Sequence, residues 1–544
     1  MQAFATLLDR LLLTPSRNGK IKLMSTYFQE TSDPARGWAL AAITRDLDIA
    51  AVKAGAIRKM AEARIDPMLF RLSYDYVGDM AETVSLIWPK PENNHSGANR
   101  PPALDEVVET LLDATRPEGA RRVEAWMDML DPNGRWALIK LVTGGLRIGV
   151  SARLAKLALA DAGRVDVTEI EEIWHGLSPP YLSLFEWLSG TAGKPVPDMS
   201  APFRPVMLAH PLIAKADRDN PDALDPALIT PDVFAAEWKW DGIRVQAASE
   251  RGTRRLYTRT GDDISHTFPD IVAAMAFEGA LDGELLVRRQ DGSVAPFNDL
   301  QQRLNRKTVS KKLIADRPAF IRAYDVLQDG EDNLRTLSFK DRRARLERFV
   351  GALDTDRFDL SALVPFQTIN ELNDGRNNPP APEIEGLMLK RWDSVYEVGR
   401  PKGPWFKWKR DPYLIDAVMM YAQRGHGRRS SMYSDFTFGV WREIDGKLEL
   451  APVGKAYFGF TDEELSALDK FVRDNTTDRF GPVRAVTATE GEGLVLEVAF
   501  EGLQRSARHK SGIAMRFPRI HRIRWDKPTH EADRLDTLVS MLPD

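Results

Sequence analysis

The sequence predicts a multidomain protein in which an all-α domain is followed by an α+β domain and then by a β-barrel. The chain has 544 residues, which is too long for a single hydrophobic core. Apolar residues recur at helical spacing up to about residue 195, whereas short alternating runs dominate after about residue 411. A proline-dense stretch at 194–232 separates the helical part from a central part of mixed character. We therefore expect three domains, at 1–200, 201–410 and 411–544.

Three consecutive helices can be placed inside the N-terminal part. Within 121–130 the apolar residues fall at i, i+3, i+4 and i+7, which is one face of a helix. The turn-forming residues at 131–134 predict a break, after which a second apolar helix is expected over about 135–142. Ser151 has a side chain that N-caps favour, so it predicts the start of a third helix.

The central and C-terminal parts contain strand signals and few helices. In the central part we expect strands at 242–247 and 279–287 and a helix over 338–350. In the C-terminal part the dipeptide at 445–446 is Asp-Gly, which predicts a hairpin turn, and 494–500 predicts a buried strand. Short alternating strands of this kind favour a small β-barrel.

The composition excludes several classes of protein. The chain has no cysteine, which rules out disulfide bonds, thiolate zinc sites and a cysteine nucleophile. No apolar run reaches the roughly 18 residues that a membrane helix needs, and residues 1–13 lack the flanks of a signal peptide. We therefore expect a cytoplasmic protein with no membrane partner. The net charge of −4 does not by itself indicate a nucleic-acid binder, but local basic surfaces can still bind phosphate.

Lys239 is a candidate nucleophile. It lies between Trp238 and Trp240, directly before Asp241 and Gly242. Desolvation and nearby cations lower the pKa of a lysine, and a neutral amine can attack an electrophile near pH 7. The alternative is a surface lysine on a strand that ends in an Asp-Gly turn. No P-loop sequence is present, so a nucleotide would be held by other means.

The segment 237–244 resembles the Lys-x-Asp-Gly-x-Arg motif of the covalent lysine nucleotidyltransferases, which include the ATP-dependent DNA ligases and the mRNA capping enzymes. The further motifs of the ligases are matched in the family's order at 257–261, 281–285, 323–327, 385–390, 405–409 and 516–527. The resemblance implies an ATP-grasp-like nucleotidyltransferase domain in the centre of the chain and an OB-fold barrel at its C-terminal end.

The resemblance also implies a role for each matched residue. Lys239, with Asp241 in the same catalytic motif, would carry AMP taken from ATP. The residues implied to bind the nucleotide are Glu237, Arg244, Arg259, Glu284, Tyr324, Met388, Arg400, Lys407 and Lys409.

Within that set, Tyr324 would stack on adenine, Glu237 would contact it, and Arg244 and Arg259 would reach the ribose or the phosphates. Lys407 and Lys409 alternate on a predicted strand and so share one face, where they can hold the α-phosphate. The alternative for these two lysines is a solvated basic stripe.

The arginine that the family often has shortly before the fifth motif has two candidates here. They are Arg400 and Lys402, and we assign Arg400.

Two glutamates are candidate metal ligands. Glu284 and Glu385 offer the hard oxygens that Mg²⁺ prefers, and Mg²⁺ or Mn²⁺ would neutralise charge during phosphoryl transfer. The alternative is that both carboxylates only form ion pairs. Near the C-terminus, Arg524, Asp526 and Lys527 match the segment that orients the pyrophosphate of ATP.

A glycine-bearing connection before Ser151 is a candidate DNA contact. Gly144, Arg147 and Gly149 lie in it, and free backbone N–H groups at a helix start bind phosphate. The alternative is an ordinary helix–helix turn. The stretch also resembles the helical DNA-binding domain of eukaryotic and archaeal replicative ligases. That likeness implies a monomer that encircles nicked double-stranded DNA.

The predicted function is therefore sealing of 3′-hydroxyl/5′-phosphate nicks with ATP, in a bacterial, nucleoid-associated enzyme. We expect a role in DNA repair more than in replication or recombination. Two alternatives remain open at this point. One is an RNA ligase or a GTP-dependent capping guanylyltransferase, and the other is a catalytically inactive clamp that only binds DNA.

Overall fold

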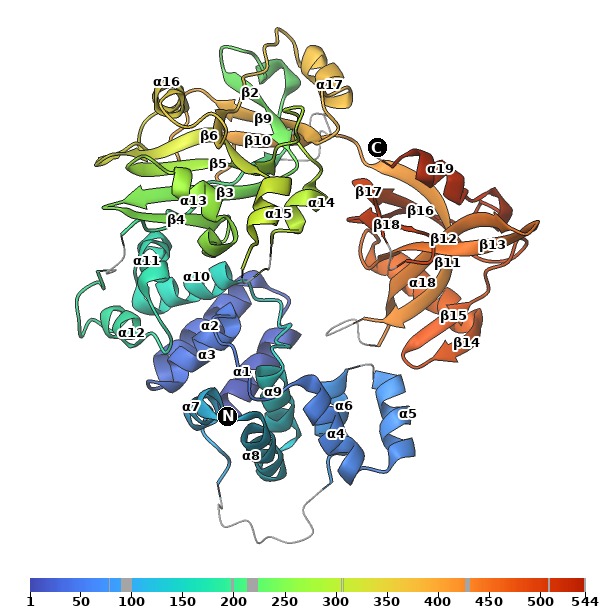
Figure 1. The fold of residues 1–544 in the computed structure, drawn as a ribbon. Helices are drawn as coiled ribbons and strands as arrows, with labels where there is room; N and C mark the ends of the chain where they lie inside the picture. The colour runs from blue at the N-terminus through green and yellow to red at the C-terminus, as the bar shows by residue number, and fades with distance from the viewer. Residues whose placement is uncertain are drawn as a thin grey trace. The chain divides into compact units, whose positions relative to one another are not determined.

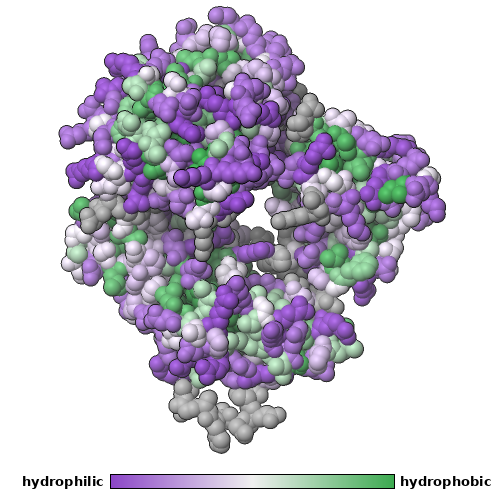
Figure 2. Space-filling model, in the orientation of Figure 1, coloured by the Kyte–Doolittle hydropathy of each residue, from purple (hydrophilic) through white to green (hydrophobic). Residues whose placement is uncertain are grey.

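A computed structural model describes residues 1–77, 79–89, 100–196, 200–212, 224–304, 306, 308–425, 431–506 and 509–542 (Figure 1). The chain separates into two compact units. One comprises 1–167, 177–195 and 412–544, and the other comprises 168–176 and 196–411. Within the described ranges, no helix is long and apolar enough to cross a membrane. On the face seen in Figure 2, hydrophilic side chains cover much of the part that holds β2 to β10.

The N-terminal part is helical throughout its described residues. Its helices are α1 (Gln2–Leu13), α2 (Arg17–Glu30), α3 (Ala35–Thr44), α4 (Ala54–Arg64), α5 (Pro67–Val77), α6 (Met80–Ile87), α7 (Leu104–Asp113), α8 (Arg116–Met129), α9 (Pro132–Val142), α10 (Ala152–Gly163), α11 (Val167–Ile173) and α12 (Leu182–Leu188). Helix α9 packs against α1 and α6, and α10 packs against α2. α11 falls largely within the second unit.

The three predicted helices are confirmed, with one boundary moved. α9 begins at Pro132 and not near residue 135, because Asp131 caps it by accepting a hydrogen bond from the Gly134 N–H at 2.7 Å. Proline fits the first helical position, where no N–H donor is needed. The Ser151 hydroxyl caps α10 by accepting from the Leu154 N–H at 3.2 Å.

The central part contains two sheets. Its strands are β1 (His210–Pro211), β2 (Phe234–Trp240), β3 (Ile243–Glu250), β4 (Thr253–Thr258), β5 (Gly279–Val287), β6 (Ala319–Asp329), β7 (Asp332–Asn333), β8 (Phe358–Leu360), β9 (Ile384–Arg391) and β10 (Trp405–Lys409). Its helices are α13 (Pro269–Ala274), α14 (Phe297–Gln301), α15 (Lys311–Asp316), α16 (Phe339–Gly351) and α17 (Ile369–Asn377). The strand orders are β1-β10-β9-β2 and β4-β3-β5-β6-β7, with β8 beside β6.

Each central sheet buries an apolar face. The outer face of β2, β9 and β10 packs Phe234, Leu387, Leu389 and Phe406 into one core. The other sheet forms a second core, and α16 packs on its strands β6 and β8. Because side chains alternate along a strand, the opposite face of β2, β9 and β10 carries most of the charged side chains of these strands. Trp405 and Met388 lie on that face too and join a third apolar core.

The C-terminal part is a curled antiparallel sheet, consistent with an OB fold. Its strands are β11 (Tyr413–Arg424), β12 (Tyr433–Ile444), β13 (Lys447–Ala456), β14 (Thr476–Phe480), β15 (Val483–Val486), β16 (Val495–Phe500), β17 (Gly502–Arg505), β18 (Ile513–Arg516) and β19 (Arg519–Arg524). Helices α18 (Asp462–Asp474) and α19 (Leu535–Ser540) complete it. The sheet runs β13-β12-β11-β15-β14, and β16 pairs with both β11 and β19.

Most expected elements are confirmed. Asp445 and Gly446 both have positive φ, 52° and 75°, as the turn between β12 and β13 requires. The fold class is also confirmed, with a helical region, a mixed α/β domain and a C-terminal β domain. The three domain ranges stay a prediction. The linker expected at 194–232 lies partly outside the described residues, at 197–199 and 213–223.

Candidate functional site

Lys239 points away from the two tryptophans beside it. Trp238 packs into the core under β2 and β9, and Trp240 packs against Leu286. Lys239 lies on the polar face and donates a hydrogen bond to Glu385. Burial opposes the ammonium form, but the carboxylates of Glu385 and Glu284 outweigh it, so the pKa of Lys239 is raised. The expected lowering of this pKa is therefore wrong, because the carboxylates that face Lys239 from β9 and β5 outweigh the effect of burial.

A bulge turns Glu385 toward Lys239. On β9, Gly386 pairs with Lys239 and Ile384 pairs with Trp240, so the register skips Glu385. Nζ of Lys409 lies 3.7 Å from Oε2 of Glu385, the same oxygen to which Lys239 donates. Burial acts to raise the pKa of Glu385, but the two lysines lower it below its usual range. The carboxylate is therefore held ionised by two ammonium groups near the same oxygen.

Glu284 lies on the neighbouring sheet and faces the same cluster. Burial raises the pKa of Glu284 to about 8, against the opposing charges of Lys239 and Arg244. The glycine that follows Asp241 explains the close approach of β5. A Cβ on Gly242 would lie 2.6 Å from the Leu285 carbonyl oxygen, so only glycine fits at this point.

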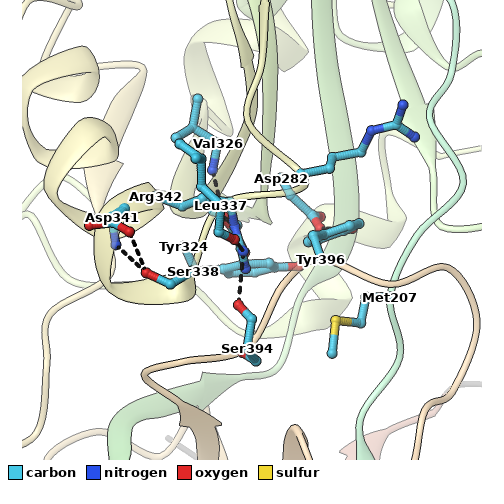
Figure 3. A network of polar contacts seen from close by, with 12 residues as sticks. Met207, Asp282, Tyr324, Val326, Leu337, Ser338, Asp341, Arg342, Ser394 and Tyr396 are labelled. Atoms are coloured by element: carbon cyan, nitrogen blue, oxygen red, sulfur yellow. Dashed lines mark hydrogen bonds and ion pairs between the residues drawn. The ribbon is translucent and has the colours of Figure 1, made fainter.

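Tyr324 is also presented by a bulge. On β5, Asp282 pairs with Asp325 and Gly283 pairs with Ala323, so the register of β6 skips Tyr324. Its neighbour Asp325 is fully buried and accepts two hydrogen bonds from Arg342 of α16, at 2.8 and 3.0 Å. Figure 3 shows the ring of Tyr324 beside this network.

Arg244 is fixed by groups of the protein itself. Its guanidinium donates to both oxygens of Asp282, to the carbonyl oxygen of Met207 at 2.6 Å and to the hydroxyl of Tyr396 at 3.1 Å. The hydroxyl of Tyr396 in turn donates to Asp282 at 2.7 Å (Figure 3). The contact expected between Arg244 and the ribose or phosphates stays a prediction.

Glu237 and Met388 pair across β2 and β9, and Met388 pairs with Lys407 on β10. The carboxyl group of Glu237 is buried, with Nζ of Lys390 2.5 Å from its Oε2 and a hydrogen bond from Arg343 at 3.1 Å. The contact expected between Glu237 and adenine stays a prediction.

Lys407 marks a concentration of positive charge. Burial lowers its pKa, and the charges of Arg400, Lys409, Lys239 and Arg259 lower it further. Several expected phosphate-binding residues therefore lie around one lysine. Such a cluster suits an anion, because a negative ligand would relieve the repulsion.

The predicted C-terminal residues form their own cluster in the β domain. Arg524 donates to Asp526 at 2.9 Å and to Asp416 of β11 at 3.4 Å. Nζ of Lys527 donates to the same oxygen of Asp416 at 2.7 Å. Asp526 is exposed, and the Arg524 hydrogen bond lowers its pKa to about 2.

The connection before α10 has the backbone that its glycines suggest. Gly144 and Gly149 have φ of 66° and 63°, and Arg147 is exposed. Nζ of Lys20 donates to the carbonyl oxygens of Ile148 and Gly149 at 2.8 and 3.1 Å, and so fixes this turn. A phosphate contact here stays a prediction.

Sequence reasoning missed Asp416 and Tyr396. Asp416 is a charged residue within an apolar strand, and this pattern could have identified it as a candidate. Tyr396 lies in an irregular segment, and nothing in its local sequence points to Asp282. The two expected metal ligands, Glu284 and Glu385, approach the same lysine. Among the described residues no three carboxylate or imidazole groups are gathered as a metal site.

Comparison with known proteins gives matches over most of the chain. Residues 211–409 match the ATP dependent DNA ligase domain, and residues 429–527 match the ATP dependent DNA ligase C terminal region. A probable DNA ligase of Koribacter versatilis is 33% identical over 472 residues, which cover 80% of this chain and 74% of that protein. A DNA ligase of Thermococcus onnurineus is 28% identical over 482 residues, 85% of this chain and 82% of that protein.

The fold is also similar to a solved structure. The protein described as Pmar-Lig_PreS3 aligns over 96% of this chain and 99% of its own, with a TM-score of 0.57 and 16% sequence identity. At this identity the likeness concerns the fold alone.

Proposed function

The chain belongs to the ATP-dependent DNA ligases, and we propose that it seals nicks through an AMP group carried on Nζ of Lys239. The observation that carries the proposal is the position of Lys239 at the centre of the polar face, between Glu385, Glu284 and the basic cluster around Lys407. An enzyme that transfers a nucleotide through an amine needs a lysine next to phosphate-binding cations.

Three transfers follow from this assignment. The neutral amine of Lys239 attacks the α-phosphorus of ATP, so a P–N bond forms, the bond to the β-phosphate oxygen breaks, and pyrophosphate leaves. An oxygen of the 5′-phosphate at the nick then attacks the same phosphorus, and the P–N bond breaks. Finally the 3′-hydroxyl oxygen attacks the 5′-phosphate, the nick closes and AMP leaves. The raised pKa of Lys239 means that its proton has to be lost before the first attack.

The donor set fits a divalent cation. Glu284 and Glu385 carry hard oxygens and face the same lysine from two different strands. We infer that these two residues would hold Mg²⁺ or Mn²⁺ together with oxygens of the nucleotide and water. When bound, the ion would neutralise the charge that develops on the phosphates.

Around this centre we assign the nucleotide contacts that the family motifs imply. Tyr324 would stack on adenine beside Met388, while Arg244, Arg259 and Arg400 would contact the ribose or phosphates. Lys407 and Lys409 would hold the α-phosphate. In the β domain, Arg524, Asp526 and Lys527 would orient the pyrophosphate. That assignment requires the domain to close on ATP and then reopen for DNA.

For the polynucleotide, we infer a grip on the backbone of nicked duplex DNA at Gly144, Arg147 and Gly149. Backbone contacts position a duplex without reading its sequence. We also propose that the protein is a monomer that encircles the duplex. We place it in the bacterial cytoplasm, associated with the nucleoid, with a role in repair. Membership of the DNA ligases disfavours an RNA ligase or a guanylyltransferase.

Labelling with radioactive nucleotide tests the proposal against two alternatives, a GTP-dependent capping enzyme and an inactive clamp. The protein is incubated with Mg²⁺ and either α-labelled ATP or α-labelled GTP, then denatured and run on a gel. We expect a covalent band from ATP only. A band from GTP only would indicate a capping enzyme, and no band from either nucleotide would indicate an inactive clamp.

A further inference from the structure

The carboxyl group of Glu237 is enclosed by two cations that come from different elements. Glu237 is 1% exposed. Nζ of Lys390, on β9, lies 2.5 Å from Oε2, and the guanidinium of Arg343, on α16, donates to Oε1 at 3.1 Å. Burying a carboxylate costs free energy unless cations pair with it. Removing either Lys390 or Arg343 would therefore leave the carboxylate of Glu237 without one of its two partners.

Lys390 connects this carboxylate to Tyr324. Its ammonium lies 4.6 Å from the centroid of the Tyr324 ring, and 4.8 Å from those of Phe339 and Trp405. It also donates to the carbonyl oxygen of Tyr324 at 3.2 Å. Because Tyr324 is a bulge residue, its ladder contacts alone do not fix its ring. Lys390 therefore supports both the backbone and the ring of Tyr324.

Arg343 is well placed to act as the fixed end of this chain of contacts. It also donates to the carbonyl oxygen of Ser361 at 2.7 Å and to Glu347 at 2.8 Å. The preceding residue, Arg342, ties the same helix to Asp325 beside the bulge. Two arginines of α16 therefore bind the site: Arg342 binds Asp325, the residue next to Tyr324, and Arg343 binds Glu237.

We propose that Arg343 is a positioning residue for the nucleotide base. It holds Glu237, Glu237 holds Lys390, and Lys390 sets the plane of the Tyr324 ring on which the base stacks. The inference rests on the proposed function, because it takes Tyr324 as the stacking residue. Arg343 lies outside every segment that the family motifs cover.

The first test compares Arg343→Gln with Glu347→Gln in self-adenylylation. Glu347 is the other ion-pair partner of Arg343, but its side chain is 49% exposed, so it serves as the matched control. We expect Arg343→Gln to raise KM for ATP about tenfold or more, the effect of losing a charged hydrogen bond, with kcat within about twofold. Arg343→Gln should also reduce the ratio of the labelling rate with ATP to the labelling rate with GTP. Glu347→Gln should change none of these, and Arg343→Lys should recover part of the loss.

A double-mutant cycle identifies the route of the effect. If Arg343 acts through Glu237, Arg343→Gln should raise KM for ATP only slightly further in a protein that already carries Glu237→Gln. Unchanged KM and base preference in Arg343→Gln would overturn the proposal, as would equal losses in both backgrounds. If Arg343→Gln does not fold, as judged by thermal unfolding, Arg343→Lys is measured in the same cycle. A failure of the proposed function would be seen in a different experiment: Lys239→Ala would still be labelled by ATP.

Discussion

A Cβ on Gly242 would lie 2.8 Å from Cγ of Glu284, so the turn that follows Lys239 packs directly against the strand of Glu284. Because side chains rarely approach so closely, the two sheets meet here without room for a methyl group. The spacing between Lys239 and Glu284 therefore depends on a residue that takes no part in the chemistry.

Gly242→Ala should lose both stability and self-adenylylation. The added methyl group forces the turn between β2 and β3 away from β5, and overpacking of this kind costs about 1–3 kcal/mol. Thermal unfolding and ATP labelling check this. Gly351→Ala is the control, since a Cβ there meets nothing within 4 Å, and it should leave both measurements near those of the parent protein. Normal labelling in Gly242→Ala would show that the spacing is not critical.

Tyr396→Phe should raise KM for ATP. The substitution removes the hydroxyl that donates to Asp282 and accepts from Arg244, while it keeps the ring. A hydrogen bond to a charged group contributes about 1.5–3 kcal/mol, so a tenfold change is expected if Arg244 shifts. Steady-state kinetics of self-adenylylation measure it. A stability loss with an unchanged KM would mean that Tyr396 only packs.

Arg524→Ala should slow self-adenylylation far more than sealing of a nick that already carries AMP. Only the first reaction has a pyrophosphate to hold. Asp416→Asn should show the same pattern in a milder form, because Asp416 bonds both Arg524 and Lys527. The two rates are measured on ATP and on pre-adenylylated nicked DNA. Equal losses in both assays would make the cluster a general structural or DNA contact.

Arg147→Ala should weaken binding to nicked duplex without changing ATP labelling. Each lost phosphate contact lowers the slope of log affinity against log salt by about 0.9. Binding is measured at several salt concentrations. Arg121→Ala, an exposed arginine on α8, is the control and should keep the parent slope. An unchanged affinity and slope in Arg147→Ala would contradict a phosphate contact at this turn.

Several features of the fold could be predicted because local chemistry sets them. Ser151 caps its helix, and the Asp445–Gly446 turn joins its strands, since both depend on a few adjacent residues. The start of α9 was misplaced because Asp-Pro-Asn-Gly suits a turn as well as a cap and first helical turn. The ordered motifs gave the family, which the comparisons confirm.

The geometry of the site could not be predicted, because it depends on bulges and on side chains distant in sequence. Glu385 and Tyr324 face the site only because the strand register skips them. The pKa of Lys239 is raised mainly by carboxylates on β9 and β5, which are distant from Lys239 in the sequence. Asp416 and Tyr396 act through partners more than 100 residues away in the chain.

Labelling of Lys239→Ala with α-labelled ATP tests the central claim most directly. The variant should form no covalent band and should not seal ordinary nicked DNA, because no amine remains to carry AMP. It should still close a nick that already carries AMP, since the last step does not use the amine. Lys312→Ala, which removes an exposed lysine of α15, serves as the control and should keep the covalent band. A covalent band of normal intensity in Lys239→Ala would contradict the account.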